Sequence, residues 1–340
     1  MTLLARDEAD VIDAQVAYHL HAGVDYVIAM DNASTDDTAE ILARYERAGY
    51  LRLIRQRGDD MRQDEWVTHL ARLAATEHDA DWVINSDADE FWWPRGGTLK
   101  EVLAAVPDRY GVVRGCWRHF LPRPEDGAFF AERMTVRLAT PAHPGAKETI
   151  YHAHQKVAHR ARRDVEVERG NHNADGVGLE PLRAWYPIEV LHFSFRSVEQ
   201  LERKARGGLL RDPASVPRHR RDLVRAAGDG RLQQLYERFS VDDAALARGR
   251  AEGTLAVDTR LRDALRSLRS GDGTFRPGAS RTLSFPRPSA VDDAAYAAET
   301  SALAEIDGIV RAHDRTDALQ RRLDALERSG IRVARRLARG

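Results

Sequence analysis

Apolar and polar positions follow two different periodicities along the first 120 residues of the chain. Short apolar runs predict strands at Thr2–Ala5, Val24–Met30, Leu51–Ile54 and Asp81–Ser86. Apolar residues at helical spacing between these runs predict a first helix capped by Asp7 and ended by Gly23, and further helices at Thr38–Ala48, Glu65–Glu77 and Leu99–Val106. Strands that alternate with helices in this way form crossover units and a mainly parallel sheet. The pattern therefore indicates an α/β fold.

The pattern of apolar and charged residues changes twice in the rest of the chain. Longer apolar segments predict strands that extend the sheet in an antiparallel manner, at Tyr110–Trp117, Ala131–Leu138, Ile150–His159, Asp164–Arg169 and Ile188–Phe195. Arg-rich helices are expected next, at Ser197–Leu210, Arg221–Ala227, Arg231–Phe239, Asp242–Ala251 and Thr259–Leu268. We divide the chain accordingly into an α/β domain at 1–207, a helical extension at 208–269, a Gly- and Pro-containing linker or arm at 270–289, and a C-terminal amphipathic helix at 290–340.

Charge and cysteine content narrow the class of protein. The 340 residues contain 52 basic and 53 acidic side chains, and this balance argues against a protein that coats nucleic acid. The single cysteine, Cys116, excludes an internal disulfide framework and a zinc site with several cysteines. The start of the chain lacks the pattern of a signal peptide, and the sequence contains no apolar run long enough to span a membrane. We therefore expect a cytoplasmic, soluble protein, with a peripheral membrane contact left open.

Three acidic residues follow the strand at Asp81–Ser86, within the segment Asp87-Ala88-Asp89-Glu90-Phe91. In an extended segment, residues two apart share a face, so two of these carboxylates can reach one divalent cation. The aromatic residues that follow anchor the acidic segment, and clustered negative charge beside buried aromatic rings is costly unless a cation compensates it. The segment predicts a Mg²⁺ or Mn²⁺ site. A solvated acidic loop is the alternative.

A second polar segment, Asp31–Asp37, follows the strand at Val24–Met30. Ligands bind at the carboxyl ends of strands in open α/β sheets. We expect Asp31 and Asn32 to hydrogen-bond the edge of a nucleobase. The alternative is that the segment only caps the helix that follows, through Ser34, Thr35 or Asp36.

Together these segments resemble the family 2-like nucleotide-sugar glycosyltransferases with the GT-A fold, in the subgroup with an Asp-Ala-Asp-Glu-Phe motif. The opening Leu3–Asp10 looks like the start of that family, with Asp7 in place of its usual Asn. Leu191–Ser197, followed by Lys204 in the next helix, is similar to its later His-Phe-x-x-Arg-Ser and Lys motif, and Gly170-Asn171-His172 looks like its Gly-Asn-His turn. The resemblance spans Met1 to Gly207 and implies a GT-A-type, Rossmann-like mixed sheet flanked by helices, with a helical C-terminal extension.

The resemblance also implies roles for single residues. The donor, a nucleotide-diphosphate sugar, would be bound by Arg6, Asp31, Asn32, Arg62, Asp87, Arg196 and Lys204. A metal ion would be held by Asp87, Asp89 and His192, and an imidazole ligand favours Mn²⁺ over Mg²⁺. Each residue has a plainer interpretation as well: His192 as a histidine of the core, and Arg196 and Lys204 as solvated helix charges.

The implied reaction transfers a sugar to an acceptor hydroxyl and inverts the anomeric centre. A carboxylate must then deprotonate the acceptor. We take Asp175 as the base, with Glu148 and Glu180 as rivals. Two other functions remain open: a nucleotidyltransferase, although the first strand is not followed by the glycine-rich loop typical of that class, and a non-catalytic scaffold with a degenerate glycosyltransferase core.

The C-terminal segment Val291–Leu337 carries one apolar seam, formed by Leu319, Leu323 and Leu326, among many arginines. A basic amphipathic helix of this kind can lie on a membrane surface, pack on the body of the chain or pair with a second subunit. The seam lacks the aromatic residues that anchor interfacial helices. We therefore favour packing on the chain itself or a homo-oligomeric contact.

Overall fold

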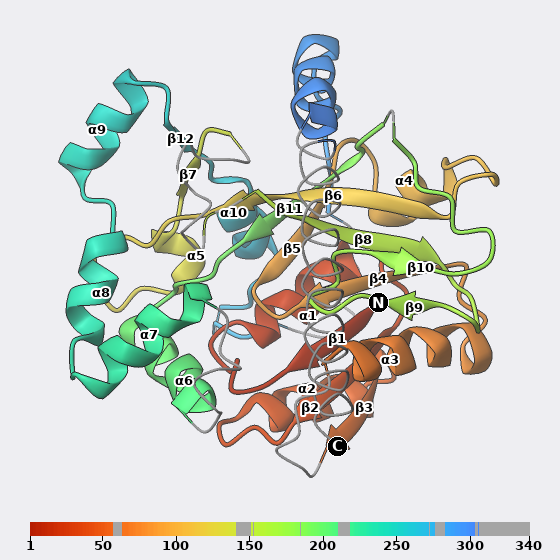
Figure 1. Ribbon diagram of the computed structural model, residues 1–340, viewed down its shortest axis with the longest axis horizontal. Coiled ribbons are helices and arrows are strands. Elements are labelled where there is room, and N and C mark those ends of the chain that lie inside the picture. The colour runs from red at the N-terminus through yellow and green to blue at the C-terminus, as the bar shows by residue number, and fades with distance from the viewer. Residues whose placement is uncertain are drawn as a thin grey trace, which may run out of the picture.

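The computed structural model describes residues 1–56, 63–140, 151, 153–183, 185–209, 218–271, 273–275, 283–302 and 305. Among these residues, eight strands form one sheet in the order β3-β2-β1-β4-β8-β6-β11-β5 (Figure 1). Its parallel half contains β1 (Thr2–Ala5), β2 (Val27–Asn32), β3 (Leu51–Gln56) and β4 (Trp82–Asp87). Its mixed half contains β8 (Gln155–Arg160), β6 (Val112–His119), β11 (Ile188–His192) and β5 (Glu90–Pro94). The expected mixed α/β fold is confirmed.

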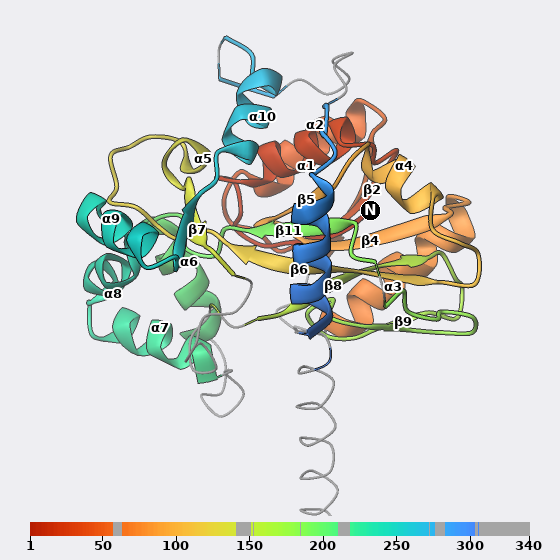
Figure 2. The same cartoon turned by 90° about the horizontal axis from the view of Figure 1, so that it is seen from above.

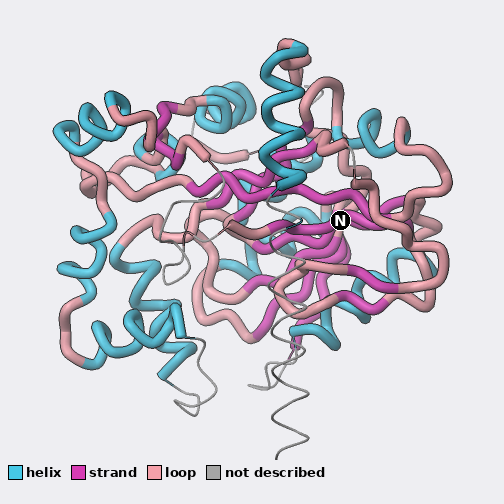
Figure 3. The backbone as a smooth tube through the Cα atoms, turned by 45° about the horizontal axis from the view of Figure 1, so that its top comes forward, coloured by secondary structure: helices cyan, strands magenta, loops and turns pink. Residues whose placement is uncertain are grey.

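Helices cover both faces of this sheet (Figure 2). One face carries α1 (Ile12–His21), α2 (Thr38–Arg47) and α4 (Leu99–Ala104). The other carries α3 (Gln63–Glu77) and the hairpin of β9 (Glu166–Val167) and β10 (Ala174–Asp175). Figure 3 shows the strands running together through the middle of the molecule with the helices outside them. Both faces of the sheet are therefore buried.

Strand β2 shows how the sequence specifies these two layers. Val27 and Ala29 pack with α1 and α2, whereas Ile28 and Met30 pack with α3. Because successive side chains of a strand point to opposite faces, a continuous apolar run fills both cores at once. This is the reason that the parallel strands read as uninterrupted apolar segments.

The connection between β4 and β5 makes the sheet curl. Only Ala88 and Asp89 separate the two strands along the chain, although β8, β6 and β11 lie between them in the sheet. Two residues let the chain cross roughly 10 Å, whereas four strand spacings in a flat sheet span about 19 Å. The mixed half must therefore bend back toward β4.

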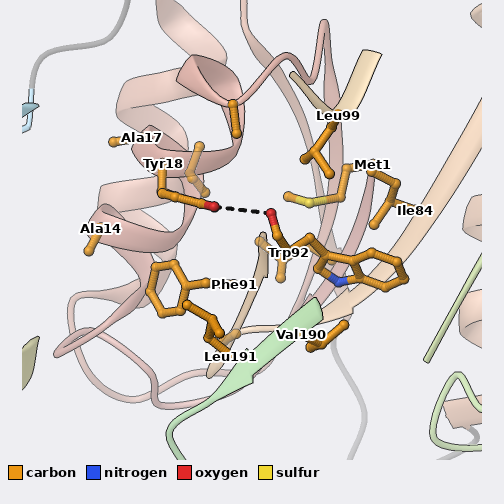
Figure 4. Close-up of a cluster of buried hydrophobic side chains, with 14 of the residues drawn as sticks. Met1, Ala14, Ala17, Tyr18, Ile84, Phe91, Trp92, Leu99, Val190 and Leu191 are labelled. Carbon is orange, nitrogen blue, oxygen red and sulfur yellow. Dashed lines mark hydrogen bonds between the residues drawn. The ribbon is translucent and has the colours of Figure 1, made fainter. Parts of the chain in front are cut away.

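Aromatic packing holds β5 in this position. The Tyr18 hydroxyl of α1 donates a hydrogen bond of 3.1 Å to the carbonyl oxygen of Trp92 in β5 (Figure 4). Phe91 and Trp92 are both fully buried: Phe91 packs against Tyr18 of α1, whereas the Trp92 ring points away from α1, toward Ile84 and Val190 (Figure 4). The sequence pattern did not predict β5 as a strand, because an unbroken aromatic run has no alternation of polar and apolar residues.

Two predicted elements are wrong in detail. Residues Ala131–Leu138 do not form one strand: they contain the short helix α5 (Phe130–Arg133) and then β7 (Val136–Leu138). Asp7 does not cap α1, whose N-cap is Val11. Asp36, one of the residues predicted to cap α2, precedes the N-cap Asp37, and its side chain accepts a hydrogen bond of 3.0 Å from the backbone N–H of Thr38.

The expected Arg-rich helices are present, and they pack on the same body as the sheet. They are α6 (Val198–Leu209), α7 (Arg218–Gly228), α8 (Leu232–Phe239), α9 (Asp243–Ala251) and α10 (Arg260–Leu268). Helix α10 packs against α1, and β12 (Leu255–Val257) pairs with β7. The domain boundary drawn after residue 207 falls within α6.

The C-terminal helix is described only at its start, over residues 290–302. There the Tyr296 hydroxyl donates to the carbonyl oxygen of Ile188 at 3.0 Å, so this part packs on the sheet. Leu319, Leu323 and Leu326 lie outside the described residues. None of the described helices is long and apolar enough to cross a membrane.

A buried carboxylate, Glu189 of β11, ties the sheet to α10. Its oxygens lie 2.8 Å from Arg118 Nε, 2.7 Å from Arg260 Nη1 and 3.4 Å from Arg95 Nη1. Burial by itself raises the pKa of Glu189, but Arg260 and Arg118 outweigh burial and lower the pKa to about 2. A carboxylate with a lowered pKa stabilises the fold above its ordinary pKa, and this contribution is lost as the pH falls toward 2.

Replacing Glu189 by Gln should lower the free energy of unfolding by about 3–5 kcal/mol at pH 7, because three arginines lose a buried counter-charge. Urea unfolding of the wild type and E189Q at pH 7 and pH 3 measures this loss. The difference between the two proteins should shrink at pH 3. Exposed Glu40 supplies the matched control, E40Q, for which we expect little change. A loss of stability that does not depend on pH would contradict the charge-based explanation.

Candidate active site

Polar side chains gather at one edge of the sheet. Strands β1, β2, β4, β6 and β11 all run in the same direction and end at this edge, whereas β8 and β5 begin there. The side chains placed there are Asp31 and Asn32 from β2, Asp87 from β4, Glu90 from β5, His119 from β6, Lys156 from β8 and His192 from β11. The predicted residues Asp31, Asn32, Asp87 and His192 thus share one edge, which is where ligands bind in open α/β sheets.

The two residues that end β2 are buried and incompletely hydrogen-bonded. Asp31 is 4% exposed and Asn32 2% exposed. Asp31 Oδ2 accepts a weak hydrogen bond of 3.4 Å from the backbone N–H of Ser34. Within the described part of the chain, Asp31 Oδ1 and Asn32 Oδ1 have no hydrogen-bond partner. Buried acceptors without a donor are costly, and at the carboxyl end of a strand such oxygens suit a ligand or a water molecule that supplies the donors.

The loop after β1 is fixed to the loop after β2. Asp7 has a φ of 54°, a conformation that Asp and Asn adopt more readily than most residues. Its Oδ1 accepts a hydrogen bond of 2.7 Å from the backbone N–H of Thr35, and its own N–H donates to Ser34 Oγ at 3.0 Å. Arg6 Nε lies 3.9 Å from the carboxylate of Asp7. A contact between Arg6 and a donor stays a prediction.

Lys156, a buried lysine of β8 that we did not predict as a site residue, pairs with the acidic motif. Lys156 is 1% exposed, and its Nζ lies 2.6 Å from Asp87 Oδ2 and 2.9 Å from Glu90 Oε1. Asn171 Nδ2 donates to Asp87 Oδ1 at 3.2 Å, and Trp117 Nε1 donates to Glu90 Oε1 at 2.8 Å. Burial by itself lowers the pKa of Lys156, but Asp87 and Glu90 outweigh burial and raise it, so the ammonium stays charged.

The second aspartate of the motif, Asp89, has different partners. Lys204 Nζ donates to Asp89 Oδ2 at 2.8 Å, while Arg196 Nη1 and His192 Nε2 each lie 3.8 Å from this carboxylate. Burial by itself raises the pKa of Asp89, but Lys204 and Arg196 outweigh it and hold the pKa well below its usual range. Asp89 therefore stays ionised at the edge of the sheet.

His192 lies in the cluster and is also tightly packed. Its ring stacks on Trp117, with 4.2 Å between ring centroids and 16° between planes, and its Nδ1 lies 3.2 Å from His119 Nδ1. Burial, above all, lowers the pKa of His192 well below its ordinary value, so the imidazole is neutral. The two interpretations of His192 drawn from the sequence are therefore compatible.

The predicted metal ligands do not form a ready-made site. Among the described residues, no group of three or more His, Cys, Asp or Glu side chains is arranged to hold a metal ion. Asp87 is occupied by Lys156 and Asn171, and Asp89 by Lys204. A divalent cation bound to these carboxylates would lie beside the two ammonium groups, which carry charge of the same sign. As arranged here, these side chains do not fit the ion, and the Mn²⁺ or Mg²⁺ cofactor stays a prediction.

Arg196 ties two segments together. It is 1% exposed and donates through Nε and Nη2 to Asp10, at 2.7 Å and 3.0 Å. It also pairs with Glu8 and donates to the carbonyl oxygen of Phe193. These bonds join the loop after β1 to the segment after β11. That Arg196 neutralises a diphosphate stays a prediction, since its guanidinium already has protein partners.

The candidate bases are placed differently. Asp175 lies exposed in β10, four residues beyond Asn171, and its Oδ2 accepts from Asn173 Nδ2 at 3.1 Å. The backbone of Glu180 instead binds Gly111 and Val112, at the opposite end of β6 from the cluster. This position argues against Glu180 as the base. Glu148 and the donor residue Arg62 lie outside the described residues.

Comparison with known proteins supports an enzyme of the expected class. Residues 4–125 match the family model described as glycosyltransferase family 92. The chain carries a glycosyltransferase domain. This match includes β1 to β6, with Asp31, Asp87 and Asp89, and it does not reach Lys156, His192 or Lys204. This match confirms the expected glycosyltransferase class. It does not single out the family 2-like subgroup.

Solved structures of TarS from S. aureus are similar at low identity. One TarS structure matches with a TM-score of 0.31 and 13% identity over 68% of this chain, and the match covers 42% of that chain. TarS 1–349 in complex with UDP-GlcNAc matches with a TM-score of 0.33 and 11% identity, over 78% of this chain and 90% of that one. No curated protein matches the chain.

Arg196→Met should lower the free energy of unfolding by about 3–5 kcal/mol, because Glu8 and Asp10 then lose their buried partner. Urea unfolding measures this loss. Arg206, in the same stretch of chain but with 71% of its side chain exposed, supplies the control R206M, which should unfold like the wild type. Equal stability of the two variants would show that Arg196 does not hold the loop after β1.

Proposed function

We propose that the protein transfers a sugar from a nucleotide-diphosphate donor to an acceptor hydroxyl. The family match over residues 4–125 supports the reaction class. The observation that carries the proposal is the pair of buried oxygens, Asp31 Oδ1 and Asn32 Oδ1, that have no donor among the described residues. Unfulfilled acceptors at this edge of the sheet suit the N–H groups of a nucleobase or the hydroxyls of a ribose.

The same oxygens distinguish this function from the scaffold alternative. A scaffold with a degenerate core has no use for buried acceptors that lack a donor, and their cost favours replacement by apolar residues. Ser34 and Thr35 bind Asp7 and hold the loop after β2 in place. The edge of the sheet is thus preorganised around Asp31, which suits a binding site.

In this proposal Lys204 faces the diphosphate of the donor. Its side chain is 25% exposed, and its Nζ lies between Asp89 and the carbonyl oxygen of Ser194. In the reaction, the acceptor oxygen bonds to the anomeric carbon while the bond from that carbon to the diphosphate oxygen breaks. Negative charge builds up on the departing diphosphate, and a preplaced ammonium group stabilises it.

The acceptor proton must go to a base when the reaction inverts the anomeric centre. We keep Asp175, whose carboxylate is exposed, as the candidate expected from the sequence. A panel of donors would identify the nucleotide and the sugar.

Asp31→Ala should weaken nucleotide binding about tenfold or more, because one lost hydrogen bond to a charged group is worth about 1.5–3 kcal/mol. The measurement is a thermal-shift panel of UDP, GDP, ADP, CDP and dTDP and their sugar conjugates. A ligand at a hundredfold excess over its Kd stabilises the folded state by about 2.7 kcal/mol.

The matched control is Asp37→Ala, an exposed aspartate in the same loop, which should bind nucleotide like the wild type. Since the Asp31 carboxylate is incompletely paired, D31A should also fold without loss of stability. If D31A and D37A bind a nucleotide equally well, Asp31 does not hold the donor. If none of the nucleotides shifts the wild type, the proposed function is wrong.

A further inference from the structure

The position of Lys156 indicates which positive charge neutralises the acidic motif. We propose that the ammonium group of Lys156 takes the place of a divalent cation at Asp87 and Glu90, so that nucleotide binding requires no added metal ion. The inference rests on the proposed function, since it concerns the same donor site. It departs from the cofactor expected from the sequence resemblance.

The geometry is that of a bound cation. The Nζ atom lies 2.6 Å from Asp87 Oδ2 and 2.9 Å from Glu90 Oε1, and it sits 5.2 Å from the centroid of the Trp117 ring. Strands β4, β5, β6 and β8 each contribute one of these four side chains. The ammonium group therefore occupies the centre of the charged cluster.

The charges explain why no further cation is needed. Asp87, Asp89 and Glu90 place three carboxylates within four residues, beside the buried ring of Phe91. Such a cluster is costly without counter-charge, and this cost was the physical reason for expecting a metal. Lys156 supplies positive charge to Asp87 and Glu90, and Lys204 and Arg196 supply it to Asp89, so each of the three carboxylates lies beside a cationic side chain.

Lys156 is also held in place more firmly than Lys204. Its side chain is 1% exposed, whereas that of Lys204 is 25% exposed. On the backbone, Lys156 is paired with Gly115 of β6. A divalent cation between Asp87 and Asp89 would lie close to a fixed ammonium group of the same sign, and like charges in a buried site repel strongly. The buried lysine thus disfavours metal at this position.

We assign Lys156 a positioning role. Its contacts are with Asp87 and Glu90, and it holds Asp87 where Asn171 Nδ2 reaches the other carboxylate oxygen at 3.2 Å. The turn at Ala88 and Asp89 is fixed between these two anchored residues. Asp89 and Lys204 are in this way set toward the donor without a metal ion.

The experiment compares nucleotide binding in EDTA with binding in Mn²⁺, by calorimetry, for the wild type and three variants. The probes are UDP, GDP, ADP, CDP and dTDP. Lys156→Met removes the charge at similar length, and Lys156→Arg keeps the charge. Lys100→Met is the matched control, because Lys100 is 65% exposed and pairs only with exposed Asp25 among its described contacts.

We expect the wild type and K100M to bind the same nucleotide with a Kd that changes less than about twofold between EDTA and Mn²⁺. K156M should bind about tenfold more weakly in EDTA and regain affinity in Mn²⁺, because the freed carboxylates then need another cation. Its melting temperature should rise with Mn²⁺ alone, whereas that of the wild type should not. K156R should resemble the wild type.

Each other outcome is decisive. Nucleotide binding by the wild type only in Mn²⁺ overturns this inference and leaves the proposed function standing. A K156M protein that binds like the wild type in EDTA also overturns it. If K156M does not fold, the comparison of the wild type and K156R in the two buffers decides. Absence of binding for every nucleotide in both buffers removes the proposed function and this inference together.

Discussion

The acidic turn between β4 and β5 imposes two constraints on the fold at once. Ala88 and Asp89 must carry the chain from the middle of the sheet to its edge, which forces the mixed half to curl. The same turn concentrates three carboxylates beside buried aromatic rings. The curl of the sheet brings β5 and its Glu90 back toward β4. One ammonium group, that of Lys156, can therefore bind both Glu90 and Asp87.

Other charged residues at the carboxyl ends of the strands hold the loops around the turn between β4 and β5. Arg196 joins Glu8 and Asp10 of the first loop to the segment that follows β11, and Lys204 of α6 reaches Asp89. Long-range ion pairs of this kind gain energy only if every buried charge finds a partner. These ion pairs hold the loops at the carboxyl ends of the strands, while Asp31 Oδ1 and Asn32 Oδ1 have no hydrogen-bond partner within the described part of the chain.

Sequence reasoning found the elements whose signals are local. The apolar runs of β1 to β4 and the Arg-rich helices after Ser197 are readable from periodicity, and Asp31 and Asp87 follow directly from strand ends. The strand β5 was missed because its aromatic residues do not alternate with polar ones, and α5 because four residues are too few for a helical period.

Lys156 was missed for a different reason. It pairs with Asp87 across 69 positions of the chain, and periodicity does not reveal which strands become neighbours. A compositional signal was present, however: only Lys100, Lys147, Lys156 and Lys204 are lysines among 52 basic residues, and two of the four lie in the acidic cluster. In a chain that otherwise uses arginine, a lysine inside an apolar strand indicates a site for a compact charge.

Lys156 lies between Asp87 and Glu90, where a cation would otherwise be expected. A crystal structure of the protein grown with Mn²⁺ and the nucleoside diphosphate that it binds, measured at the manganese absorption edge, would show directly which cation the site holds. We predict the nucleotide beside Asp31, the Lys156 ammonium between Asp87 and Glu90, and no anomalous peak at Asp87 or Asp89. A manganese peak bridging Asp87 and Asp89, with Lys156 displaced, would contradict this prediction.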